Sequence, residues 1–276
     1  MQEVRFRSLV ATCLIAFGTS AAVAKGWPAP AAGPSKSGDP ELLFTFDDGP
    51  NPKTTPEVLD TLAKHHIHAV FFLVGDMVVN PKTMKVKPDA QRIIERILRE
   101  GHVIGTHTMT HKDLCKIKED RAVYEIDDGK AAIDGVAGMR SIWFRVPGGV
   151  RCKRLEDMLA ERHLQHFHWD LDPQEWKHKD AKKAFKYVTT ELAKSADRNV
   201  LLMHDVKIAT VKALPEILDW LDAENARRTA AHKRPIRVIQ APELAIERLP
   251  EGLLDFLRDV APDPHALAEE LASVLP

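Results

Sequence analysis

Residues 44–50 read FTFDDGP, and the rest of the chain is best understood outward from this stretch. Two adjacent acids, Asp47 and Asp48, stand where an apolar strand ends, and a Gly-Pro turn follows at once. Neighbouring carboxylates disfavour each other's ionisation, so their placement side by side needs a reason. An ordinary solvated turn is one reason, because Asp, Gly and Pro are common turn residues. The stretch alone does not decide whether the two acids form an ordinary turn or have a function.

From residue 41 onward, short apolar runs alternate with amphipathic stretches. The runs predicted as strands are Leu42–Phe46, Ala69–Val74, His102–Gly105, Ile142–Val146, Phe167–Leu171, Val200–Met203 and Arg237–Ile239. The stretches predicted as helices begin at Thr54-Thr55-Pro56-Glu57 and continue with Ala90–Arg99, Arg121–Ile133, Lys153–Leu164, Ala181–Lys194 and Val211–Asn225. Such alternation is typical of parallel βα units. The sequence therefore predicts an α/β fold of about seven parallel strands, either a barrel or a doubly wound sheet.

The ends of the chain have a different composition. Arg5 and Arg7 precede the apolar run 9–17, and Ala22-Val23-Ala24 follows as a cleavage site, which predicts a signal peptide over residues 1–24. The apolar run is too short to span a bilayer, although an uncleaved anchor is the alternative. Residues 25–40 are predicted to be a flexible lead-in, residues 41–247 the catalytic domain, and residues 248–276 a helical extension. We expect a secreted or periplasmic protein, cleaved after Ala24.

Charge and cysteine content narrow the class of protein. The chain has 276 residues, is 44% hydrophobic and has a formal net charge of -1, so nothing points to nucleic acid or to insertion in a membrane. Cys115 and Cys152 are the cysteines outside the predicted signal peptide. In an oxidising compartment they form either one disulfide or two buried thiols.

Strongly polar residues cluster where the predicted strands end. The groups are Asp47-Asp48, His107 to His111, Arg145 to Gly148, the run Asp170, Asp172, Glu175 and Trp176, and His204-Asp205. Parallel strands in a βα barrel deliver their carboxyl ends to one rim, and that rim carries the active site. We therefore expect these five groups to meet.

A metal site accounts for part of this set. His107 and His111 are spaced i, i+4, which would place both imidazoles on one face of a helical turn. Two imidazoles and one carboxylate, with a position left open, match a catalytic zinc site. A nearby cation would also keep two adjacent carboxylates ionised, so that one acid binds metal while its neighbour takes a proton from the attacking water.

Five motifs in this order carry a resemblance to a known family. They are TFDDGP, HTMTH, RVPG, WDLDPQEW and LLMHD, spread over about residues 41–245. This set resembles the motifs of the polysaccharide deacetylase family, the NodB-homology enzymes of carbohydrate esterase family 4. The resemblance implies a distorted, incomplete (β/α) barrel, in agreement with the predicted strands.

The resemblance also implies roles for the metal and the base. Asp48, His107 and His111 would bind a divalent metal, usually zinc, with cobalt or nickel as alternatives for such a ligand set. Asp47 would be the general base, and Arg145 would orient it.

The remaining implied roles concern the acid and the substrate. His204 would be the general acid, supported in its protonated form by Asp172. The backbone N–H of Gly148 would bind the oxyanion, and Trp176 and Leu202 would line the acetyl pocket.

The chain departs from the family pattern at two places. Glu175 stands before Trp176 where the family usually has Asp, and we assign it no catalytic role from sequence. Gly148-Gly149 stands where many members have an aromatic residue and a glycine, which predicts a more open groove. Cys115 and Cys152 each lie four residues beyond a motif, so we predict a disulfide between them if the motifs share one rim.

The predicted function is removal of N-acetyl groups from N-acetylglucosamine residues of a polysaccharide, either peptidoglycan or chitin-type oligomers. An O-acetyl esterase acting on xylan or another glycan uses the same residues and is the nearest alternative. A catalytically silent glycan-binding envelope protein is the contrasting alternative, although such a protein would usually have lost one of the residues named above. A glycoside hydrolase would leave the two spaced histidines unexplained.

Overall fold

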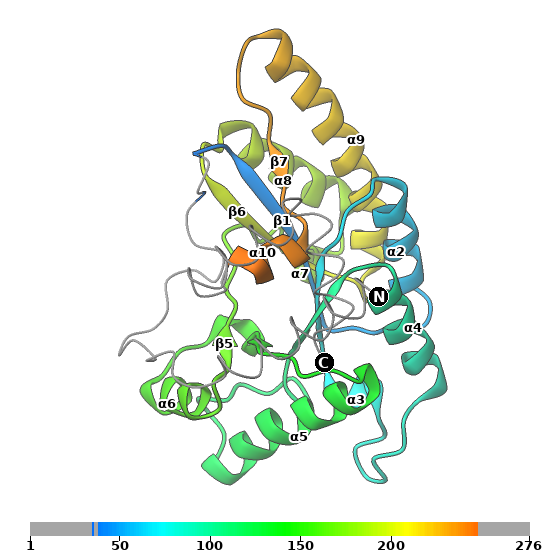
Figure 1. Cartoon of the computed structure of the whole chain (residues 1–276), viewed down its shortest axis with the longest axis vertical. Helices are drawn as coiled ribbons and strands as arrows, with labels where there is room; N and C mark the ends of the chain where they lie inside the picture. The colour runs from blue at the N-terminus through cyan, green and yellow to red at the C-terminus, as the bar shows by residue number, and fades with distance from the viewer. Residues whose placement is uncertain (1–34, 36–37, 248–276) are drawn as a thin grey trace, which may run out of the picture.

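The computed structural model of the protein describes residue 35 and residues 38–247 (Figure 1). Its strands are β1 (Glu41–Asp47), β2 (Val70–Leu73), β3 (Val103–Thr106), β4 (Trp143–Phe144), β5 (Gln165–His166), β6 (Arg198–His204) and β7 (Arg237–Val238). Its helices are α2 (Thr55–Lys64), α3 (Gly75–Val78), α4 (Pro88–Arg99), α5 (Glu119–Ala137), α6 (Lys153–Glu161), α7 (Glu175–His178), α8 (Ala181–Lys194), α9 (Ile208–Ala230) and α10 (Ala241–Glu247), with a short 3₁₀ helix over Pro147–Gly149.

The strands form one curled, parallel sheet in the order β5-β4-β3-β2-β1-β6, and β7 pairs with the start of β1. Helices α2, α4 and α9 lie side by side over one part of its outer surface (Figure 1). The prediction of a distorted (β/α) barrel is confirmed. In the register of the central strands, Asp47 lies opposite Phe72 of β2 and His204 of β6, so two of the predicted site residues are direct neighbours.

One predicted strand is wrong. Residues 167–171 are irregular, and β5 covers only Gln165–His166. The carboxylate of Asp170 accepts a hydrogen bond from Val200 N–H (2.8 Å), which displaces regular ladder pairing at that position. Leu171 alone makes a parallel bridge, to Leu201 of β6. The segment after β5 therefore crosses to the other edge of the sheet and completes the barrel with irregular backbone.

Strand β1 shows why the barrel is apolar at its base and polar at its rim. Successive side chains of a strand point to opposite faces, and all seven residues of β1 are buried. Phe44 and Phe46 pack outward in the large core beneath the helices. The inward series is Leu43, Thr45 and Asp47, which runs from the apolar floor to the rim. The floor is covered by α10, whose Leu244 packs into the same inner cluster as Leu43.

Most predicted helices are confirmed, with shifted ends. Helix α8 begins where predicted because the Asp180 side chain accepts hydrogen bonds from the N–H groups of Lys182 and Lys183. Helix α6 ends three residues earlier than predicted, and α9 extends beyond both predicted ends. No helix of residues 38–247 is long and apolar enough to cross a bilayer. The predicted signal peptide and the helical extension lie outside the described residues.

Candidate active site

The two adjacent acids reach the same imidazole because the backbone turns between them. Asp48 has a left-handed backbone (φ 75°), which an Asp tolerates better than most residues. Successive side chains of a strand normally point to opposite faces, but this turn brings the carboxylates of Asp47 and Asp48 to the same side. His107 Nε2 lies 3.6 Å from Asp47 Oδ2 and 3.7 Å from Asp48 Oδ1. Asp47 is buried, whereas the Asp48 side chain is 24% exposed, so the pair divides into an inner and an outer carboxylate.

The two histidines come from a loop and not from the predicted helical turn. Residues 107–111 follow β3 in irregular backbone, with left-handed conformations at Thr108 (φ 69°) and His111 (φ 55°). The Thr108 hydroxyl accepts a hydrogen bond from His111 N–H (2.9 Å), which closes the loop. The imidazole centroids are 4.9 Å apart. Their proximity was predicted correctly, but it results from a strained loop, a feature found often at functional sites.

Helix α5 supports this loop from behind. Glu125 is completely buried, and its carboxylate accepts hydrogen bonds from Thr110 N–H (2.6 Å) and the Thr110 hydroxyl (2.5 Å). Gly129, one turn further along α5, touches the loop so closely that an added Cβ would lie 2.5 Å from Met109 N. The loop is therefore held by hydrogen bonds to the Glu125 carboxylate and packs directly against the backbone of α5 at Gly129.

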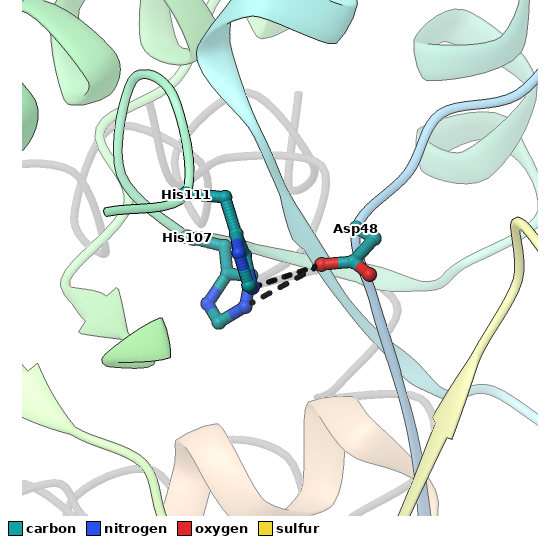
Figure 2. Close-up of side chains that lie close together, drawn as sticks. All are labelled: Asp48, His107 and His111. Carbon is teal, nitrogen blue, oxygen red and sulfur yellow. Dashed lines mark ion pairs between the residues drawn. The ribbon is translucent and has the colours of Figure 1, made fainter. Parts of the chain in front are cut away.

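Asp48, His107 and His111 have the chemistry of a metal site (Figure 2). One ligand atom from each lies within 4.8 Å of the others. His111 Nε2 is 3.3 Å from Asp48 Oδ1, and His107 Nε2 is 3.7 Å from it. Two ligands of a tetrahedral zinc ion are about 3.3 Å apart, as follows from Zn–ligand bonds of about 2.0 Å. Asp48 Oδ1 is a buried acceptor that has no hydrogen-bond partner among the described residues, which suits a metal ligand. These residues fit a divalent metal.

The surroundings of His107 favour the form that binds metal. Burial, the largest cause, lowers the pKa of His107 to about 3, so the ring is neutral. Its Nδ1 lies 2.7 Å from the carbonyl oxygen of Arg145 and donates to it, which directs the Nε2 lone pair at Asp48. The half-exposed His111 leaves the outer side of the site open to solvent.

Arg145 is completely buried and fixes Asp47. Its Nη1 donates to Asp47 Oδ1 (2.8 Å) and to the Thr45 hydroxyl (2.8 Å), and its Nε donates to the carbonyl of Phe167 (2.9 Å). The guanidinium also lies 4.2 Å above the Phe72 ring. Burial raises the pKa of Asp47 and outweighs the charge and hydrogen bond of Arg145, so Asp47 binds a proton more readily than an ordinary Asp.

The partner of His204 differs from the predicted one. Glu175, not Asp172, holds the imidazole: Glu175 Oε1 lies 2.8 Å from His204 Nδ1 and accepts the His204 N–H at 2.9 Å. Asp172 instead accepts the N–H of Gln174 (2.8 Å). Burial, the largest cause, lowers the pKa of His204, but the hydrogen bond and charge of Glu175 together with the charges of Asp47 and Asp48 outweigh it, and the net shift is upward. The longer side chain of Glu175 reaches the histidine from α7, and its place directly before Trp176 was the available signal.

Two of the predicted substrate residues, Leu202 and Trp176, lie near His204. Leu202 is buried on the same face of β6, two residues before His204. The Trp176 side chain is 44% exposed, and its ring lies 6.4 Å from the His204 ring. Gly148 has φ 64°, and nothing lies within 4 Å of a Cβ added there. That open space agrees with the wider groove predicted from the missing aromatic side chain.

A disulfide and a buried carboxylate connect segments of the site to the rest of the barrel. Cys115 and Cys152 form a disulfide, with Cα atoms 6.0 Å apart, between the segments that follow the histidine loop and Gly149. Asp205 is completely buried and accepts a hydrogen bond from the Thr55 hydroxyl; burial raises its pKa to about 7. Its carboxylate fills the space where Gly49 would carry a Cβ, so it secures the turn after Asp48.

The chain is similar in sequence to known polysaccharide deacetylases. The family model described as polysaccharide deacetylase matches residues 35–166. The chain is 32% identical over 182 residues to the peptidoglycan-N-acetylmuramic acid deacetylase PdaC of Bacillus subtilis, covering 65% of this chain and 35% of that protein. It is 34% identical over 174 residues to a chitooligosaccharide deacetylase of Sinorhizobium fredii, covering 62% of this chain and 74% of that protein.

A solved structure of peptidoglycan deacetylase PdaC from Bacillus subtilis superposes with a TM-score of 0.60 at 26% identity. The superposition covers 81% of this chain and 98% of that one. The chain belongs to the polysaccharide deacetylase family.

Proposed function

We propose that the protein is a metal-dependent hydrolase that removes N-acetyl groups from N-acetylglucosamine residues of a polysaccharide. The observation that carries the proposal is the position of Asp47. One of its oxygens accepts from Arg145, the other lies 3.6 Å from His107, and His204 stands opposite it in the sheet. A base, a metal-ligand set and an acid therefore meet at one rim, as hydrolysis of an unreactive amide requires.

Asp48, His107 and His111 hold the divalent ion in this proposal. A bound ion supplies a Lewis acid that polarises the acetyl carbonyl and favours ionisation of water near neutral pH. Two imidazoles and a carboxylate suit zinc, and cobalt or nickel fit the same set.

Asp47 is the general base. It takes a proton from the attacking water, and the buried Arg145 keeps its carboxylate aimed at the reaction position. The Gly148 N–H donates to the oxygen that becomes negative as water adds, a contribution typically of a few kcal/mol.

His204 is the general acid. The amine is a poor leaving group and departs only when its nitrogen is protonated. Glu175 supports this step because its carboxylate favours the protonated imidazole. Trp176 and Leu202 line the pocket that receives the acetyl methyl group.

The names of curated relatives support the proposed substrate class, and the substrate class in turn supports the proposed location. Curated relatives are named for peptidoglycan and for chitooligosaccharides, which supports polymers of N-acetylated sugars as the substrate class. A polymer of the cell envelope would be met outside the cytoplasm. The proposal therefore includes a secreted or periplasmic location and cleavage after Ala24.

Acetate release from three glycans tests the proposal. The metal-loaded protein is incubated with N-acetylglucosamine oligomers, with peptidoglycan and with acetylated xylan. We expect release from at least one amide substrate at a rate above that from the xylan ester. Release from xylan alone would favour the O-acetyl esterase, and no release together with glycan binding would favour the silent binding protein.

A further inference from the structure

Helix α7 and the first turns of α8 carry a dense group of exposed positive charges. Its members, here called the lysine surface, are Lys177, Lys179, Lys182, Lys183 and Lys186. All five side chains are exposed, and no ion pair to any of them is found among the described residues. The acids of the same stretch are engaged elsewhere: Glu175 is buried on His204, and Asp180 caps α8.

The lysines at the start of α8 are placed against the local preferences of a helix. Lys182 and Lys183 occupy the first turn of α8, which contains no acidic residue. Positive charge is unfavourable there, because the helix dipole is positive at its N-terminus. Lys182 and Lys186 are also four residues apart, a spacing at which like charges repel. Departures from local rules are expected where function requires them.

The α7 end of the lysine surface adjoins the active site. Glu175, at the start of α7, bonds to His204, and the neighbouring Trp176 lies 6.4 Å from the same ring. Lys177 follows directly. Lys183 is eight residues after Glu175, so it lies no more than about 28 Å away even along an extended chain. A polysaccharide with one sugar in the site would extend over this distance.

Charge of this kind is not general to the protein. The formal net charge of the whole chain is -1, so five exposed lysines within ten residues, none of them in an ion pair within the described part of the chain, are a local concentration. Such a concentration attracts anions and raises their association rate. A neutral chitin-type oligomer gains nothing from it, whereas a glycan that carries carboxylates does.

We propose that the lysine surface binds carboxylates of an anionic N-acetylated glycan while an acetamido group of the same strand occupies the active site. The inference rests on the proposed deacetylase function and narrows its substrate class. Carboxylates of this kind occur on the peptide and lactyl groups of peptidoglycan and on uronic acids of other glycans, and the experiment separates the two.

The test compares kcat/KM for acetate release by the full-length, metal-loaded protein on three substrates. They are a neutral N-acetylglucosamine hexamer, soluble peptidoglycan strands with stem peptides, and hyaluronan fragments, in which N-acetylglucosamine alternates with uronic acid. Each is measured between about 20 and 300 mM salt, a range over which exposed charges become screened. We expect kcat/KM for the anionic substrate to fall about tenfold, with less than a twofold change for the neutral one.

A matched pair of variants identifies the surface responsible. Lys182→Glu/Lys183→Glu should reduce kcat/KM on the anionic glycan by about tenfold and leave the hexamer within twofold. The variant should fold, because acidic side chains suit a helix N-terminus. Lys64→Glu/Lys233→Glu changes the net charge equally at the exposed end of α2 and just after α9 and should have no effect.

The outcomes separate this inference from the proposed function. A response on peptidoglycan, on hyaluronan or on both supports the inference and names the source of the carboxylates. Equal salt and variant effects on the neutral hexamer would overturn it. If no substrate releases acetate, the proposed function fails, and co-sedimentation with insoluble peptidoglycan decides the inference: unchanged binding by the Lys182→Glu/Lys183→Glu variant would refute it.

Discussion

At the scale of single residues, His204 depends on its carboxylate partner. Glu175→Gln keeps the shape of the contact but removes the charge that raises the pKa of His204. We expect the alkaline limb of kcat/KM to move to lower pH, because His204 without the charge of Glu175 loses its proton at lower pH. The matched variant Asp172→Asn should move the limb less, and the reverse order would return the role to Asp172.

Arg145 and Asp47 form a buried ion pair, and loss of one partner should lower the free energy of unfolding. Arg145→Met leaves the Asp47 carboxylate buried without its cation, and removal of one partner of such a pair costs about 3–5 kcal/mol. Adding Asp47→Asn removes the uncompensated carboxylate and should restore part of the lost free energy of unfolding. Urea unfolding of the two single variants and the double variant measures this coupling. Strictly additive losses would show that the pair is not coupled.

At the scale of elements, α5 positions the histidine loop through a missing side chain. Gly129→Ala would place a Cβ 2.5 Å from Met109 N, so the loop must shift and zinc affinity should fall by about 10- to 100-fold. Gly135→Ala is the control on the same helix, because nothing lies within 4 Å of its added Cβ. That change should stabilise the helix by up to about 1 kcal/mol and leave zinc binding unchanged. Isothermal titration with zinc and thermal unfolding give both readouts, and equal zinc affinity in the two variants would contradict this role of α5.

The sequence predicts elements well where one strong pattern acts alone. Helix α8 has a cap at Asp180 and a regular apolar stripe, and strand β1 has a mostly apolar run, so both were found. The prediction failed at residues 167–171, where the Asp170 side chain takes a backbone donor of β6. Such a tertiary contact has no signature in local periodicity.

At the scale of the whole molecule, the disulfide joins two segments of the rim. Cys115 and Cys152 are separated by 37 residues, and closing a loop of that size limits the unfolded chain. Cys115→Ser/Cys152→Ser should lower the free energy of unfolding by about 2–4 kcal/mol. Urea unfolding of the oxidised protein and of this variant measures the difference. A variant as stable as the native protein would show that the bridge contributes nothing to the fold.

The site could be predicted from sequence as a set of residue types at one rim, because parallel strands fix which ends meet. Its internal pairing could not. The choice between Glu175 and Asp172 depends on where α7 begins and how far each side chain reaches. Likewise, the two histidines converge through left-handed backbone at Thr108 and His111, and not through helical spacing.

Metal dependence tests the central claim most directly, namely that Asp48, His107 and His111 hold an ion beside a separate base, Asp47. Metal content and acetate release would be measured on the native protein, after chelation, after zinc is restored, and on Asp47→Asn. We predict about one ion per chain, activity lost on chelation and regained with zinc, and an Asp47→Asn protein that retains its metal but releases acetate at least a hundredfold more slowly. Full activity after the metal has been removed, or an active Asp47→Asn protein, would contradict the account.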